Sequence, residues 1–222
     1  MTTRVKCITP EGVLSFPALL EARKASEDAK PKFGVTLLFY PDQVQQYLPG
    51  KADLKALKAA VAQVAQEEFG KKLPEMIKSG KFKSPFLSDE EQIEKYGWPE
   101  GTIYLRLSSL RKPGVVSGLR DANGKPTVLT DQEIEEKLYP GARVRCSVRP
   151  FAYDVSGNRG VSFDLQNVQL LGDGERIDGR SNAEDEFEAT TEAADLADSD
   201  APAEAPAAAA PAKAAASIED ML

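Results

Sequence analysis

Ala142–Tyr153 reads Ala-Arg-Val-Arg-Cys-Ser-Val-Arg-Pro-Phe-Ala-Tyr, and it alternates between small apolar residues and larger polar or aromatic ones. Side chains alternate between the two faces of a β-strand, so this pattern predicts a strand with one face in a core. The opposite face carries Arg143, Arg145, Arg149, Phe151 and Tyr153. Guanidinium groups attract phosphates and flat rings stack on bases, so this face is predicted to bind single-stranded nucleic acid.

Four further strands are expected around this one. Gly160–Leu171 is the second long strand, and the intervening Ser156-Gly157-Asn158-Arg159-Gly160 has the composition of a hairpin turn. The other three are rich in β-branched and aromatic residues or alternate in polarity: Arg4–Ile8, Phe33–Tyr40 and Thr102–Leu110. The charged segment Glu21–Lys32 is expected to be a solvent-facing connection. Five strands with hairpins at the end predict a mainly β fold, a small closed or partly open barrel, rather than a parallel α/β sheet.

One long helix is inserted in the middle of this β fold. Apolar residues repeat at helical spacing over Asp53–Phe69, where Asp53 can cap the start and Gly70 the end. Ser88–Glu91 and Thr130–Glu133 both have the form of a capping box. Each of these two segments predicts the start of a short helix.

The charge of the chain is divided unevenly. Residues 1–172 carry 25 Lys/Arg against 21 Asp/Glu, a net +4, whereas residues 183–222 carry eleven Asp/Glu against one Lys, a net −10. Sixteen Ala and three Pro account for much of the remaining tail, a composition typical of disordered segments. We therefore expect a folded domain over residues 1–175 and a disordered acidic tail over residues 176–222.

The composition argues against several classes of function. The chain has no histidine and only two cysteines, Cys7 and Cys146, which excludes an ordinary structural zinc site and removes the commonest general base. It has no glycine-rich phosphate-binding loop and no nucleophile motif, so we expect no cofactor, no metal and no catalysis. No apolar run is long enough to span a membrane, and none follows Met1–Lys6 as in a secretory signal. Free thiols in a reducing cytoplasm are therefore expected.

A second group of cationic and aromatic residues extends the predicted DNA-binding surface. In the strand Thr102–Leu110, the face opposite the apolar one carries Tyr104 and Arg106. The other members precede or follow that strand: Lys81, Lys83, Trp98, Arg111 and Lys112. Alternative readings stay open, because arginines often only solvate an antiparallel sheet and a tryptophan in a turn can anchor a loop. Phe151 and Tyr153 could likewise close the end of a barrel.

The segment from Tyr139-Pro140-Gly141 to Val168-Gln169 makes the interpretation more specific. Its strands, Tyr-Pro-Gly-Ala-Arg-Val-Arg-Cys-Ser-Val-Arg-Pro-Phe-Ala-Tyr-Asp and Gly-Asn-Arg-Gly-Val-Ser-Phe-Asp-Leu-Gln-Asn-Val-Gln, resemble the signature of a family of tailed-bacteriophage single-stranded DNA-binding proteins. Members combine an OB-fold core with an acidic C-terminal tail. The resemblance covers about residues 1–175 in the order of elements. It implies an OB-fold-like, five-stranded antiparallel β-barrel with an inserted helix.

The resemblance also implies a function. Such a protein is not an enzyme; it coats and protects exposed strands during phage DNA replication and recombination, in the cytoplasm of the infected bacterial host. As a monomer or dimer it would bind single-stranded DNA, and duplex DNA more weakly. From the division of charge we further expect the tail to compete with DNA for the cationic surface and, once displaced, to recruit replication or recombination proteins. The predicted partner-binding tip comprises Ile218, Glu219, Asp220, Met221 and Leu222.

Two other functions stay open from the sequence. The same β fold and tail would suit a protein-binding β-barrel adaptor, which would have no affinity for polynucleotides. Carboxylates could instead hold magnesium in a nuclease, although they stand at expected helix starts and turns: Asp89, Glu90, Glu91, Asp121 and Asp131. Metal-dependent cleavage of a labelled oligonucleotide would identify the nuclease, and a lack of DNA affinity would favour the adaptor.

Overall fold

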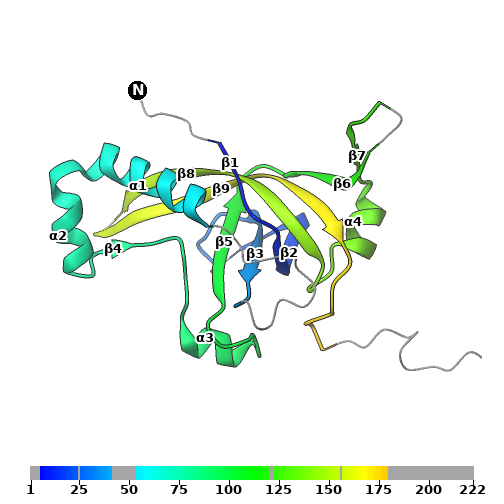
Figure 1. The fold of residues 1–222 in the computed structure, drawn as a ribbon, viewed down its shortest axis with the longest axis horizontal. Coiled ribbons are helices and arrows are strands. Elements are labelled where there is room, and N and C mark those ends of the chain that lie inside the picture. The colour runs from blue at the N-terminus through cyan, green and yellow to red at the C-terminus, as the bar shows by residue number, and fades with distance from the viewer. Residues whose placement is uncertain (1–5, 25, 42–53, 121–122, 156, 180–222) are drawn as a thin grey trace, which may run out of the picture. The chain divides into compact units, whose positions relative to one another are not determined.

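A closed ring of five strands forms the centre of the fold (Figure 1). The computed structural model describes residues 6–24, 26–41, 54–120, 123–155 and 157–179. In ring order the strands are β2 (Gly12–Arg23), β3 (Lys32–Phe39), β5 (Ile103–Ser109), β9 (Asn158–Gly172) and β8 (Arg143–Val155). β8 pairs with both β9 and β2, which closes the ring. The predicted mainly β fold with an inserted helix is confirmed.

One pair of neighbours in the ring is parallel, whereas the sequence analysis expects a wholly antiparallel barrel. β5 and β9 run in the same direction, with Leu107 opposite Phe163 and Ser108 opposite Asp164. The other four neighbouring pairs are antiparallel. A closed ring with an odd number of strands cannot alternate direction all the way round, so at least one pair must be parallel.

The ring contains one strand that the sequence analysis misses. The sequence analysis expects a ring strand at Arg4–Ile8, but β2 occupies that place in the ring. Of the expected strand, the structure shows only β1 (Cys7–Ile8), which pairs with β8. Arg4 and Val5 lie outside the described residues. β2 lacks a clean alternation because two register shifts interrupt its pairing with β3. It also extends into the predicted connection Glu21–Lys32, which is shortened to residues 24–31.

Besides β1, three short strands extend the sheet outside the ring. β6 (Gly114–Arg120) adds to β9 in parallel, and β7 (Pro126–Val128) pairs with β6 at the end of the sheet. β4 (Phe82–Lys83) pairs with β9 close to the β8–β9 turn. Val155 and Asn158 stand opposite each other, so β8 and β9 form a hairpin at the predicted place.

The inserted helix is α1 (Lys55–Phe69), which ends at Gly70 as predicted. Asp53, which the sequence predicts as its cap, lies outside the described residues. The chain continues through the short turn η2 (Gly70–Lys72) into α2 (Leu73–Lys78). The buried side chains of α1 stand at the predicted helical spacing: Leu57, Ala60, Val61, Val64 and Ala65.

The two short helices are both present, and one begins a residue later than predicted. α4 (Asp131–Lys137) has the predicted capping box, in which Thr130 Oγ1 accepts from the Glu133 N–H and the Thr130 N–H donates to the Glu133 carboxylate. In α3 (Glu90–Lys95) the cap is Asp89 rather than Ser88, because Asp89 Oδ1 accepts from the Gln92 N–H at 3.1 Å.

The buried apolar residues form two clusters, one inside the ring and one outside it. The interior of the ring is the main core, and the inward residues of β8 predicted from the alternation, such as Val144, Cys146 and Val148, are fully buried there. A second cluster lies outside the ring, where α3 and the turn after it cover Tyr104 of β5 and Leu38 of β3. Figure 1 shows α3 beside one end of β5.

The folded part extends a few residues beyond the predicted boundary at 175. The Arg176 guanidinium lies 4.3 Å from the centre of the Tyr139 ring, and the Ile177 N–H donates to the Pro140 carbonyl at 3.2 Å. Residues 180–222, which include nearly all of the predicted tail, lie outside the described residues. Within the described ranges, every helix is too short or too polar to span a membrane.

The two cysteines are free thiols, as the sequence predicts. Cys146 is fully buried, and burial raises the pKa of its thiol to about 12. Burial also raises the pKa of the Cys7 thiol. Because thiolates are the reactive form, the raised pKa lowers the reactivity of both thiols.

Candidate nucleic-acid interface

An open groove of about 660 Å³ lies on the outer faces of β3 and β5, bounded by β2 and the connection 24–31. Small residues leave this space open. Ala18 of β2 stands opposite Gly34 of β3, and a Cβ on Gly34 would lie 2.6 Å from the Leu107 backbone oxygen. The close approach of β3 to β5 therefore requires glycine here, and the absence of its side chain deepens the groove.

The groove is strongly cationic. Its charged lining residues are Arg23, Lys24, Lys30, Lys32 and Arg106, and all five are exposed. None of them forms an ion pair with the residues that the structure describes, and no carboxylate belongs to the described lining. Five unpaired positive charges around one groove attract a polyanion.

An aromatic ring stands at the edge of this groove on a strained backbone. Phe16 has φ +47°, the only positive value at a non-glycine residue in the described ranges. It lies in the register shift between Ser15 and Ala18, where Pro17 cannot donate to a neighbouring strand. Such a conformation costs about 1–3 kcal/mol and is found most often at functional sites. The bulge leaves the Phe16 side chain 46% exposed.

Phe16 belongs to a chain of four aromatic rings. Its centroid is 4.8 Å from that of Tyr96, which in turn lies 5.1 Å from Trp98. Trp98 contacts Tyr104 at 5.2 Å, and the Arg106 guanidinium lies 5.6 Å above the Tyr104 ring. Phe16 and Tyr96 are exposed, whereas Trp98 and Tyr104 are buried. The two buried rings therefore hold the two exposed rings in place at the surface.

The burial of Tyr104 and Trp98 contradicts the prediction that these two residues contact DNA. Tyr104 is 2% exposed and Trp98 is 8% exposed, so neither ring is available for a base to stack on. Alternation along β5 does turn Tyr104 away from the main core, as predicted. The sequence gives no sign, however, that α3 and the turn after it would cover that face.

The predicted arginine row lies on the outer face of β8, but two of its members have partners within the protein. Arg143 forms an ion pair with Glu11 at 3.4 Å and donates to the Asp173 carbonyl. Arg145 Nε donates to Gln169 Oε1 at 2.7 Å. The Arg149 Nε is buried and forms no hydrogen bond with the described residues. Phe151 is exposed at the far end of the row, and Tyr153 is half-buried.

The remaining predicted cations are exposed but are spread over other parts of the surface. Lys81 and Lys83 lie at β4, and Lys112 forms an ion pair with Asp131 at 2.8 Å. Arg111 follows β5, and of this whole group only Arg106 lines the groove. DNA contacts by these residues, and by the β8 row, stay predictions.

The sequence analysis misses most of the groove. Phe16, Tyr96 and four of the five cations are not among its candidates. A signal was present, because Arg23, Lys24, Lys30 and Lys32 fall within ten residues of sequence. Their convergence with Arg106 depends on the pairing of β3 with β5, which places Thr36 opposite Arg106.

The carboxylates considered for a magnesium site have structural positions. Asp89 caps α3, Glu90 and Glu91 stand in its first turn, and Asp131 pairs with Lys112. Asp121 lies outside the described residues, as does the predicted partner-binding tip 218–222. Over the described ranges, no group of three or more Cys, Asp or Glu residues is placed to hold a metal ion.

Comparisons with known proteins show which solved structures share this fold. Among solved structures, the single-stranded DNA-binding protein from bacteriophage Enc34 in complex with ssDNA has 18% sequence identity and a TM-score of 0.53, covering 77% of this chain and 88% of that chain. A second structure of the bacteriophage Enc34 protein has 17% identity and a TM-score of 0.52, covering 82% of this chain and 90% of that chain. At these identities the likeness shows a shared fold.

A search of curated proteins finds no match. The family model described as Enterobacter phage Enc34, ssDNA-binding protein, matches residues 5–197, which is most of the sequence. The chain therefore belongs to the family of the Enterobacter phage Enc34 ssDNA-binding protein.

Proposed function

We propose that this protein binds single-stranded DNA without regard to sequence, in the groove over β3 and β5. The observation that carries the proposal is the exposed pair Phe16 and Tyr96 beside a groove with five unpaired cations and no carboxylate. In chain order β3 and β5 are the second and third strands of the ring, and residues 24–31 join the first strand to the second. OB-folds bind oligonucleotides on this face, with this loop at its border.

Two forces act on the strand, and neither reads its sequence. Lysine and arginine side chains neutralise phosphates and release counterions, which makes the affinity depend on salt. Stacking of a base on Phe16 or Tyr96 adds about 1–3 kcal/mol, and every base has a flat face to offer. In duplex DNA the bases already stack on each other, so only the phosphate term remains and the duplex binds more weakly.

A protein with these properties coats and protects exposed strands in phage DNA replication and recombination, in the cytoplasm of the infected host. Binding needs no chemical step, so the protein acts without enzymatic activity. Coating covers the phosphodiester backbone against nucleases, and a base held on an aromatic ring is not free to pair within a hairpin.

The acidic tail regulates access to the groove. Residues 173–222 carry three Arg/Lys against fourteen Asp/Glu, a net −11, whereas residues 1–172 have a net +4. A tethered polyanion competes with DNA for the groove cations, and DNA in excess displaces it. The displaced tip, Ile218–Leu222, then recruits replication or recombination proteins.

The outer face of β8 is a second surface for the strand, reached beyond the groove. Phe151 offers an exposed ring there, and the half-buried Arg149 lies in the same row. Arg143 forms an ion pair and Arg145 forms a hydrogen bond within the protein, so this face attracts phosphates less strongly than the groove does.

The test is a fluorescence-anisotropy titration of labelled oligo-dT and of a matching duplex at two salt concentrations. Tight single-strand binding that weakens with salt supports the proposal. If neither DNA binds, even after deletion of residues 183–222, the proposal is wrong and the β-barrel adaptor becomes the better interpretation.

A further inference from the structure

The centre of the groove floor is formed by four residues, two on β3 and two on β5. Thr36 stands opposite Arg106, and Gly34 stands opposite Ser108. All four line the groove, and they lie on the outer face because the residue between them on each strand belongs to the main core. Gly34 has no side chain, so the floor is open at its corner of this square.

The side chains at the other three corners can all donate hydrogen bonds. Thr36 and Ser108 carry hydroxyl groups, and Arg106 carries a guanidinium group, which only donates. Neither hydroxyl forms a hydrogen bond with the residues that the structure describes, and no carboxylate belongs to the described lining of the groove. In the free protein these donors are therefore left to solvent.

The hydroxyl of Thr36 is unusual for its burial. The residue is 8% exposed, yet its hydroxyl oxygen still reaches solvent, and it does so on the groove floor. A nearly buried hydroxyl without a partner costs free energy, and a valine would fill the same space without leaving a polar group unpaired. A ligand that accepts a hydrogen bond from Thr36 removes this cost.

Arg106 is held beside the same part of the floor. Its guanidinium lies 5.6 Å from the centre of the Tyr104 ring, which stands two residues earlier on the same face of β5. Residues directly opposite each other on antiparallel strands have their Cβ atoms about 5 Å apart. The hydroxyl of Thr36 and the charge of Arg106 can therefore reach the same group of a ligand.

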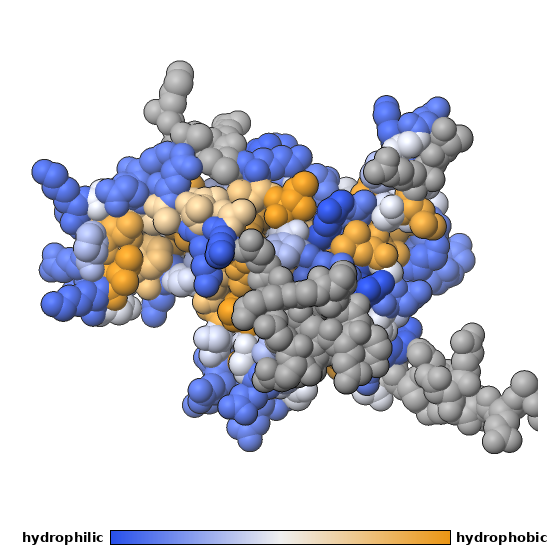
Figure 2. All heavy atoms as spheres, viewed as in Figure 1, coloured by the Kyte–Doolittle hydropathy of each residue, from blue (hydrophilic) through white to orange (hydrophobic). Residues whose placement is uncertain are grey.

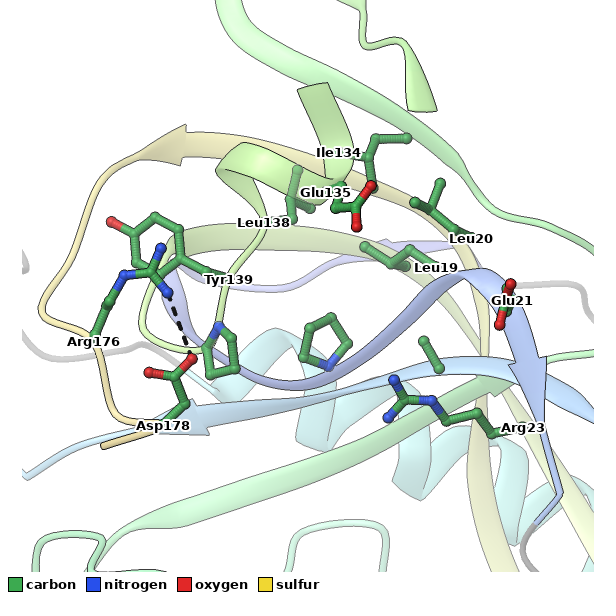
Figure 3. Close-up of a pocket in the computed structure, with 13 residues that line it drawn as sticks. Leu19, Leu20, Glu21, Arg23, Ile134, Glu135, Leu138, Tyr139, Arg176 and Asp178 are labelled. Atoms are coloured by element: carbon green, nitrogen blue, oxygen red, sulfur yellow. Dashed lines mark hydrogen bonds and ion pairs between the residues drawn. The ribbon is translucent and has the colours of Figure 1, made fainter. Parts of the chain in front are cut away.

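Charged side chains alone do not distinguish this floor from the rest of the surface. Hydrophilic residues cover much of the face in Figure 2, including α2 and α3. A second pocket of about 520 Å³, on β2 and α4, contains both signs of charge, and its Arg176 already contacts Asp178 and the Tyr139 ring (Figure 3). The groove floor combines a charged donor with unpaired hydroxyls and has no carboxylate in its described lining.

We propose that Thr36, Arg106 and Ser108 bind one phosphate of the DNA strand directly, on the floor above Gly34. A phosphodiester group is negatively charged and only accepts hydrogen bonds, so it matches a site made of three donors. Base edges mix donors and acceptors and differ from one base to the next. A phosphate held here fixes the strand beside the two exposed aromatic rings. The inference rests on the proposed function and names the contact that positions the strand.

The first test removes the hydroxyls without changing the charge. Thr36→Val and Ser108→Ala should each raise the Kd for oligo-dT roughly two- to tenfold, because each removes one hydrogen bond. Neither should alter the slope of log K against log salt, since a neutral donor releases no counterion. Arg106→Gln should raise the Kd and also lower the slope by about 0.7. Thr127→Val, on β7 and outside the groove lining, is the matched control and should change neither.

The second test locates the contact at a phosphate. A methylphosphonate linkage is neutral, and it can be moved one position at a time along the shortest oligo-dT that binds with full affinity. For the unmodified chain, one linkage position should weaken binding more than the others. At that position Thr36→Val should cause less further loss than elsewhere, because the two changes remove the same interaction. Equal losses at every position would overturn the proposal.

Oligo-dA and oligo-dC of the same length test the rival contact to a base edge. Thr36→Val should weaken binding to all three homopolymers by the same factor. A loss confined to one of them would show that the hydroxyl reads a base, and the phosphate assignment would be wrong.

These outcomes also distinguish this inference from the proposed function. If Thr36→Val and Ser108→Ala are folded in thermal unfolding and bind DNA as the unmodified chain does, the floor contact is wrong and the groove stands. If the unmodified chain binds no DNA, the proposed function itself fails, and this inference fails with it.

Discussion

The Phe16 ring meets the Tyr96 ring edge-on, with their centroids 4.8 Å apart and their planes at 68°. The two residues are eighty positions apart in the chain, and the bulge in β2 and the turn after α3 bring them together. Phe16 is 46% exposed and Tyr96 is 38% exposed, so both offer a surface to a ligand. Edge-to-face contact fixes the orientation of each ring without covering its faces completely.

Replacement of these rings should weaken DNA binding without unfolding the domain. Phe16→Ala or Tyr96→Ala removes a stacking surface worth about 1–3 kcal/mol, so the Kd for oligo-dT should rise roughly 5- to 150-fold. Anisotropy titration measures the change, and thermal unfolding confirms that each variant is folded.

Phe151→Ala is the matched control for the aromatic variants, because Phe151 is similarly exposed but lies on β8. Its effect should be smaller than that of Phe16→Ala. If Phe151→Ala weakens binding strongly and Phe16→Ala does not, the strand runs over β8 and the groove assignment is wrong.

Removal of groove cations should change the dependence of binding on salt. The triple variant Lys24→Gln, Lys30→Gln, Lys32→Gln eliminates three phosphate contacts, each of which adds about 0.7 to the slope of log K against log salt for a single strand. The slope should therefore fall by about 2. Titrations at four or more salt concentrations measure the slope. Lys71→Gln and Lys72→Gln on η2, which do not line the groove, are the control pair. An unchanged slope in the triple variant would remove these lysines from the interface.

Deletion of residues 183–222 should tighten DNA binding, because it removes eleven acidic residues that compete for the groove. The increase in DNA affinity should be largest at low salt and should become smaller as salt screens the charges. Titrations of the full and shortened chains between about 20 and 300 mM salt measure this effect. Equal affinities across that range would show that the tail does not compete with DNA.

The capping box of α4 should contribute to stability in a manner that depends on pH. Hydrogen bonds from the Thr130 N–H and hydroxyl, and then from Lys137, lower the pKa of the Glu133 carboxyl from its ordinary value of 4.5. A lowered pKa in the folded state stabilises the fold above the unfolded pKa, and this contribution is lost as pH falls through the folded value. Thr130→Ala removes the hydroxyl that accepts from the Glu133 N–H and donates to the Glu133 carboxylate. It should destabilise the domain at neutral pH and destabilise it less in acid. Denaturant unfolding at several pH values measures it, with Thr127→Ala on β7 as the control.

Some properties of this protein follow from short stretches of sequence. Alternation in Ala142–Tyr153 correctly separates buried Val144 and Cys146 from outward Arg145 and Phe151, because the direction of a side chain in a strand depends only on parity. The box Thr130–Glu133 predicts the start of α4, because its hydrogen bonds join residues three positions apart. The family resemblance likewise depends on the continuous segment Tyr139–Gln169.

Tertiary structure alone decided which face became the groove. Alternation along β5 shows that the side chains of Tyr104 and Arg106 point away from the main core. In the structure α3 covers Tyr104, whereas Arg106 stays exposed. The irregular β2 has no regular period to detect, because its bulge exists only relative to the register of β3. The sequence by itself determined four of the five ring strands, the inserted helix and the separation of charge, since these are local. The groove required pairing between distant strands, and that pairing brings Phe16 to Tyr96 and the 24–31 connection to Arg106.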